Sequence, residues 1–171
     1  EGFSWSFKKI GKSLLWAFLV FLATTAVVTA YQTLVVIPLM KQTVEASGAA
    51  AEESVRPFWS RLVEYAYIVY EGLIEVLIFI GFLLDRMARK WKPAWALLAS
   101  NVLFALWHYN YWRKGPLEGS LMIILTFLAG LLISLGYLKT KNSLTPALSH
   151  FLVDAPSGLK ELFGITIPFI S

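Results

Sequence analysis

The stretch LVEYAYIVYEGLIEVLIFIGFLL, from Leu62 to Leu84, decides how this chain folds. It is apolar and longer than the ~20 residues that a helix needs to cross a bilayer, yet it carries Glu64, Glu71 and Glu75. A charged side chain at the centre of such a helix costs about 2.5 to 3.5 kcal/mol on insertion scales. Glu75 lies well inside the stretch, so it needs a proton, a polar partner or a function.

The composition of the whole chain indicates a membrane protein. Hydrophobic residues make up 57% of the 171 residues and charged residues only 15%, and the mean hydropathy is +0.64. The net charge of +4 does not indicate nucleic-acid binding, because Lys and Arg lie mostly at the ends of apolar runs, beside lipid head groups. We therefore expect the lipid bilayer, and no nucleic acid, as a partner. Cysteine is absent, which excludes a thiol nucleophile and a cysteine metal site.

An earlier uncharged run, from Ser13 to Met40, predicts a first transmembrane helix. The alternative is a signal peptide cleaved after VTA at residues 28–30. The apolar run continues beyond this point and is too long for a signal peptide, which favours a retained helix. Before it, EGFSWSFKKIGK resembles an interfacial lead-in, and the polar residues 41–61 predict an exposed loop with a short interfacial helix.

Helices are also predicted after the Glu-bearing stretch. One runs over residues 94–112 and another over 117–138, where Gly130 and Ser134 are spaced for close helix packing. Two shorter apolar pieces follow, LTPALSHFLVDAP and LKELFGITIPFI, with Pro156 between them. These pieces form either one kinked crossing or a buried helix followed by an interfacial tail.

The predicted fold class is all-α, a polytopic helical membrane protein. Residues 1–61 would hold the interfacial segment, the first transmembrane helix and the polar loop, and residues 62–171 would form the core. The densest basic cluster lies in the loop 85–92 and comprises Arg86, Arg89, Lys90 and Lys92. By the positive-inside rule, this loop and the N-terminus are predicted to be cytoplasmic.

Three of the predicted helices each carry polar side chains on one face, three or four residues apart. These faces hold Glu71 with Glu75, Asn101 with His108 and the aromatic Phe104 between them, and His150 with Asp154. The chain has two histidines, His108 and His150, and both lie within apolar segments. If the three faces converge, Glu75 and Asp154 join the two histidines in one water-accessible pocket.

Such a set of side chains can carry out hydrolysis in two ways. A carboxylate can act as general base on a water molecule that a histidine positions, while a second histidine stabilises the oxyanion. Alternatively, Glu75, His108 and His150 hold a divalent metal ion such as zinc, which lowers the pKa of its bound water. The sequence leaves both open because it lacks the compact H-E-x-x-H pattern.

Three short motifs carry a resemblance to a known family. They are EVLIFIGFL from Glu75, FALWH from Phe104 and HFLVD from His150. They resemble the E-E-x-x-x-R, F-x-x-x-H and H-x-x-x-N/D motifs of the CPBP membrane proteins, which include the type II CAAX prenyl endopeptidases and the bacterial Abi proteins. The resemblance covers residues 62–156 and implies a four-helix core, here preceded by one transmembrane helix.

The resemblance also implies an activity and its residues. A member of this family would be an intramembrane endopeptidase acting on a peptide or membrane-protein substrate. Glu75 and His108 would activate water, His150 and Asp154 would stabilise the oxyanion, and Phe104 would support the site.

The first motif departs from the family pattern. Val76 stands where the second Glu belongs, and Ile80 stands where the Arg belongs. Glu71, one turn earlier, could partly replace the missing carboxylate. The missing pair favours an alternative, a catalytically inactive CPBP-like scaffold that binds a stable membrane-protein partner.

Structural roles remain open for several of these residues. A single histidine in an apolar helix is more often a hydrogen-bond partner between helices than a catalyst, and Glu71, Asn101 and Asp154 could serve in the same way. Two histidines in matched motifs favour the functional interpretation. A subunit whose histidines ligate haem or chlorophyll is a further alternative.

Overall fold

The computed structural model describes residues 10–41 and 57–163, and for residues 156–163 it describes the backbone alone. The described part consists of helices and short connections, with no strand among them. The elements in chain order are α1 (Ile10–Tyr31), η1 (Gln32–Val36), α3 (Phe58–Glu75), η2 (Val76–Leu84), α4 (Asp85–Ala88), α5 (Pro93–Trp107), η3 (Tyr109–Lys114), α6 (Pro116–Thr140) and α7 (Leu144–Phe163).

Three helices in the described part are long and apolar enough to cross a membrane. They span Ile10–Lys41, Phe58–Ala88 and Pro116–Thr140, and the shorter apolar helix Pro93–Trp107 lies between the last two in sequence. Many of their large apolar side chains are exposed, as is usual where lipid rather than water surrounds a protein. The predicted class, an all-α polytopic membrane protein, is confirmed.

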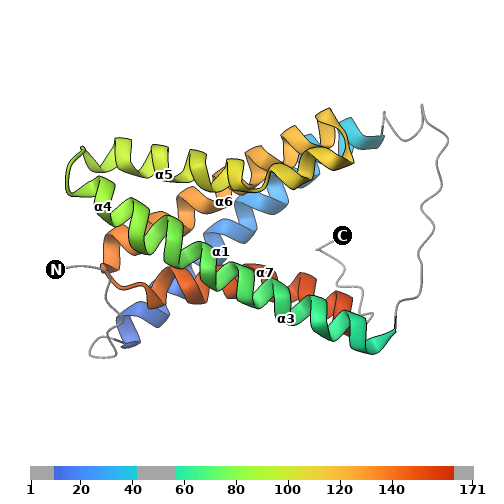
Figure 1. Ribbon diagram of the computed structural model, residues 1–171, viewed down its shortest axis with the longest axis horizontal. Coiled ribbons are helices and arrows are strands. Elements are labelled where there is room, and N and C mark those ends of the chain that lie inside the picture. The colour runs from blue at the N-terminus through green and yellow to red at the C-terminus, as the bar shows by residue number, and fades with distance from the viewer. Residues whose placement is uncertain (1–9, 42–56, 164–171) are drawn as a thin grey trace.

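The helices pack into one bundle (Figure 1). The rod formed by α3, η2 and α4 lies along α7, and α5 packs on α6. Helix α1 packs against both α6 and α7, so it adheres closely to the core. The predicted division at residue 61 stays a prediction.

An apolar cluster joins five of these elements. Its buried members come from α1, η2, α5, α6 and α7, namely Val20, Val76, Ile80, Leu84, Ala96, Ile133, Tyr137 and Ala147. Burial of apolar side chains against one another fixes the helices relative to each other, and so fixes the side chains that they carry.

Close packing at Gly130 connects α6 to α5. A Cβ atom at this position would lie 2.5 Å from Oδ1 of Asn101 and 2.7 Å from Cδ1 of Phe104, which leaves room only for glycine. Nearby, Nδ2 of Asn101 donates a hydrogen bond of 3.1 Å to Oγ of Ser134. The predicted small-residue face of Gly130 and Ser134 is confirmed.

Several predicted boundaries were wrong. The helix expected over 62–84 begins at Phe58, and its second half, Val76–Leu84, is π-helical. The helix expected over 94–112 ends at Trp107 and continues as the 3₁₀ helix η3.

The first apolar piece and the beginning of the second form one continuous helix, α7, which runs from Leu144 through Pro156 to Phe163, and the rest of the second piece lies outside the described residues. Proline lacks only one backbone donor, so a helix can pass through it when the surrounding packing holds. The interfacial lead-in falls largely within residues 1–9 and the expected short helix within residues 42–56, and both lie outside the described residues. The cytoplasmic placement of the N-terminus and of loop 85–92 stays a prediction.

Candidate active site

The predicted site residues meet at one cavity of about 560 Å³ between α3, η3 and α7. We call it the chamber. Its lining includes Glu71, Glu75, His108, His150 and Asp154. Phe104 is buried beside it and contacts both imidazole rings. The structure therefore brings together every side chain that the sequence placed in a common pocket.

Glu75 is the last residue of α3, directly before the π-helical segment, and its side chain is only 5% exposed. Its carboxylate lies between the two imidazoles. Oε1 is 3.4 Å from Nε2 of His108, and Oε2 is 4.0 Å from Nε2 of His150. Oε1 has no hydrogen-bond partner among the described residues. A buried carboxylate in this state needs a proton or a donor, as the sequence indicated.

His108 follows the last turn of α5, at the junction with η3, and its backbone has left helical geometry at φ −81° and ψ 28°. Nδ1 lies 3.0 Å from the carbonyl oxygen of Phe104. The imidazole also lies between two aromatic rings, with Phe104 edge-on at a centroid distance of 5.0 Å and Tyr111 tilted at 5.4 Å. These contacts fix the ring so that Nε2 faces Glu75.

The contact with Phe104 decides which nitrogen of His108 carries the proton. A carbonyl oxygen only accepts, so Nδ1 must carry the hydrogen that it donates to Phe104. In the neutral ring Nε2 is then an acceptor, and it faces Oε1 of Glu75, a second acceptor. A hydrogen on either atom, or a water molecule that donates to both, satisfies this pair.

His150 and Asp154 lie one helical turn apart on α7. Nε2 of His150 is 3.3 Å from Oδ2 of Asp154, so the carboxylate orients the imidazole. Gly72 on α3 lies directly against this pair, because a Cβ atom there would be in ordinary van der Waals contact, 3.4 Å from Oδ2 of Asp154 and 3.6 Å from Cε1 of His150.

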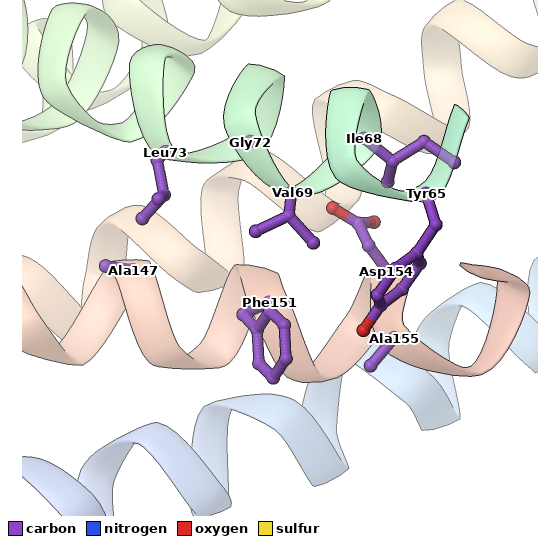
Figure 2. Close-up of a pocket in the computed structure, with 9 residues that line it drawn as sticks. All are labelled: Tyr65, Ile68, Val69, Gly72, Leu73, Ala147, Phe151, Asp154 and Ala155. Atoms are coloured by element: carbon purple, nitrogen blue, oxygen red, sulfur yellow. The ribbon is translucent and has the colours of Figure 1, made fainter. Parts of the chain in front are cut away.

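A narrow apolar slot adjoins the chamber at the same place. Figure 2 shows the side chain of Asp154 rising from α7 toward α3, beside Ile68 and Gly72. These three residues line both the slot and the chamber. The other slot residues are apolar or aromatic, namely Tyr65, Val69, Leu73, Ala147, Phe151 and Ala155.

The predicted metal ligands lie near one another, with Nε2 of His108 and of His150 at 3.4 and 4.0 Å from the carboxylate oxygens of Glu75. Within residues 10–41 and 57–155, no group of three His, Asp or Glu side chains is placed so that it already forms a metal site. The metal set of Glu75, His108 and His150 stays a prediction.

The chamber also has an aromatic wall that was not predicted from the residue spacing. Tyr109, Asn110 and Tyr111 in η3 line it together with Trp107, because the chain turns at His108 and does not continue as a helix. Burial raises the pKa of the Tyr111 phenol, which also hydrogen-bonds with the side chain of Thr126. The aromatic run HYNYW, from His108 to Trp112, was the feature of the sequence that could have indicated this wall.

Comparison with known protein families gives a match over the site. A model of the family described as type II CAAX prenyl endopeptidase Rce1-like matches residues 57–156. No curated protein and no solved structure matches the chain. The matched residues run from the beginning of α3 into α7 and include every charged residue that lines the chamber.

Proposed function

The chain belongs to the Rce1-like family of type II CAAX prenyl endopeptidases, and from this we propose that it is an intramembrane endopeptidase. Glu75 and His108 activate the water molecule that attacks the peptide bond. One observation carries the proposal: the Glu75 carboxylate lies between the imidazoles of His108 and His150 in a chamber of about 560 Å³. A cavity of this size admits a segment of peptide as well as water.

Water activation follows from the two acceptors that face each other. Oε1 of Glu75 and Nε2 of His108 are 3.4 Å apart, so one water molecule can donate a hydrogen to each. Its lone pair is then directed away from both acceptors, toward a bound carbonyl carbon. As the carbon–oxygen bond forms, Glu75 takes the proton as general base.

Stabilisation of the oxyanion falls to His150. The attacked carbonyl oxygen gains a negative charge, and the imidazolium of His150, paired with Asp154 at 3.3 Å, supplies a positive charge beside the chamber. Asp154 acts here by orienting His150. This role agrees with its contact to the imidazole and needs no direct contact with the oxyanion.

Attack of water on the carbonyl carbon gives a tetrahedral intermediate, and the breakdown of this intermediate completes the reaction. The carbon–nitrogen bond breaks, and the leaving nitrogen takes the proton that Glu75 received from water. The products are a carboxylic acid and an amine, and Glu75 returns to its ionised form.

The incomplete first motif does not remove any group from the chamber. Val76 and Ile80 belong to the apolar cluster, where they pack beside Leu84, and neither lines the chamber. Apolar residues that replace a buried charged pair together are often neutral or stabilising. The absence of this Glu and Arg is therefore compatible with activity.

The test uses the full chain in proteoliposomes with a pool of quenched fluorescent peptides, each made with and without a prenylated cysteine. Glu75→Gln and His108→Ala should each lower kcat/KM by about 10²- to 10⁴-fold. Glu118→Gln is the matched control, because Glu118 pairs with Lys114 outside the chamber. Its cleavage rate should equal that of the unmodified protein.

The alternative, a catalytically inactive scaffold, gives a different result. No peptide would be cleaved, and a membrane-protein partner would copurify equally with the unmodified chain and with Glu75→Gln. That combination of results would refute the endopeptidase.

A further inference from the structure

The chamber contains more acidic groups than its basic groups can balance. The described residues that line it include the carboxylates of Glu71, Glu75 and Asp154 and the imidazoles of His108 and His150, but no Lys or Arg. With three ionised carboxylates and both imidazoles protonated, one negative charge remains. With neutral imidazoles, the chamber is more negative still.

Glu71 is the carboxylate that remains without a positive partner. Glu75 and Asp154 lie within 4.0 Å of an imidazole nitrogen, whereas no ion pair or hydrogen bond involves Glu71 among the described residues. Glu71 is half-buried on α3, one turn before Glu75, and it lines the same chamber. A half-buried carboxylate of this kind favours a cation beside it.

A second observation points to a ligand in the same cavity. Glu75, which is 4% exposed and lines the chamber, has its Oε1 atom without a hydrogen-bond partner in the described part of the chain. The water molecule proposed above, or a donor on a bound molecule, would satisfy it. The walls are also aromatic, with Tyr67, Trp107, Tyr109 and Tyr111. Aromatic faces attract ammonium and guanidinium groups and pack on their alkyl stems.

We propose that the chamber recognises a Lys or Arg side chain of the peptide substrate, and that Glu71 is the specificity-determining residue. This inference rests on the proposed endopeptidase function and names its substrate class. A substrate that instead presents a carboxylate side chain at this position is disfavoured by repulsion from Glu71.

Matched peptides test the proposal by binding, independently of cleavage. Three peptides differ at one position near the scissile bond, which carries Lys, norleucine or Glu, and they are titrated into the detergent-solubilised full chain. The position is scanned along the peptide. At one position the Lys peptide should bind about tenfold more tightly than the norleucine peptide, and the Glu peptide should bind most weakly.

Two variants connect the preference to Glu71. Glu71→Gln has nearly the same shape, and it should bring the Lys-to-norleucine ratio close to one, whereas Glu71→Asp should keep most of the preference. Glu118→Gln, which lies outside the chamber, should leave the ratio unchanged. Far-ultraviolet circular dichroism and gel filtration check that all three variants are folded.

The outcomes separate this proposal from the proposed function. Equal binding and equal cleavage of Lys and norleucine peptides at every position would overturn the cation preference and leave the endopeptidase standing. Preferential binding of Lys peptides without any cleavage would refute the endopeptidase but support cation recognition. A preference that survives in Glu71→Gln, or that disappears with EDTA and returns with zinc, would overturn the role given to Glu71.

Discussion

The ring of Phe104 stands nearly perpendicular to the imidazole of His108, at 77° and a centroid distance of 5.0 Å, and the carbonyl oxygen of Phe104 lies 3.0 Å from Nδ1 of His108. Phe104 thus holds the imidazole of His108 through both its side chain and its backbone. Phe104 also meets the ring of His150 edge-on, at 6.1 Å.

Substitution of Phe104 tests this positioning role. Phe104→Leu should keep the backbone contact but release both imidazoles from the aromatic edge, and we expect kcat to fall about tenfold while KM changes less. The measurement is steady-state cleavage in proteoliposomes. Phe82→Leu serves as the control, because Phe82 is exposed on η2 and should leave both constants unchanged. Equal effects of the two substitutions would contradict the role given to Phe104.

Gly130 permits the close approach of α6 to Asn101 and Phe104. Gly130→Ala would place a Cβ atom 2.7 Å from Cδ1 of Phe104, so the helices must separate, and stability should fall by about 1 to 3 kcal/mol. Thermal unfolding in detergent measures the change. Gly11→Ala is the matched control, because nothing lies within 4 Å of its added Cβ atom and alanine favours helix by about 0.5 to 1 kcal/mol. An unchanged Tm for Gly130→Ala would refute the packing described here.

Restoring the family pattern at the first motif should harm this protein. Val76→Glu places a carboxylate in the apolar cluster, where a buried unpaired charge costs about 3 to 5 kcal/mol. Adding Ile80→Arg should recover part of the loss by pairing the charges. Neither variant should be more active than the unmodified chain, because neither position lines the chamber. A rise in kcat for the double variant would show that the missing pair limits activity.

Chelation tests the mechanism that uses side chains and water. Since no three described His, Asp or Glu side chains are placed to hold a metal ion, EDTA and 1,10-phenanthroline should leave cleavage unchanged. The measurement is the initial rate before and after dialysis against each chelator, with a known zinc peptidase treated in parallel. Loss of activity that zinc restores would favour the metal set of Glu75, His108 and His150.

Much of the arrangement around Glu75 could be predicted from residue spacing. Helical periodicity placed Glu71 with Glu75 and His150 with Asp154, because both pairs lie within long regular helices. The convergence of the three faces could only be proposed, since it depends on packing between segments distant in sequence, such as Gly130 against Phe104.

Local backbone changes were the main source of error. The spacing of apolar residues gave no indication that α5 ends at Trp107. The aromatic residues of η3 were therefore assigned to a helix, although they line the chamber. The π-helical turns from Val76 to Leu84 could not be predicted either, because their side chains are as apolar as those of an α-helix that crosses a membrane.

Gly72 has a consequence for how this protein keeps charge apart from hydrocarbon. The chamber and the apolar slot share this residue, and the slot is bordered by Leu73 and Phe151, whose side chains are exposed on the outer surface. In an integral membrane protein that outer surface meets acyl chains. Gly72 adds no side chain at this point, so the side chains that separate lipid from the acidic interior here are those of Ile68 and Asp154, which line both cavities.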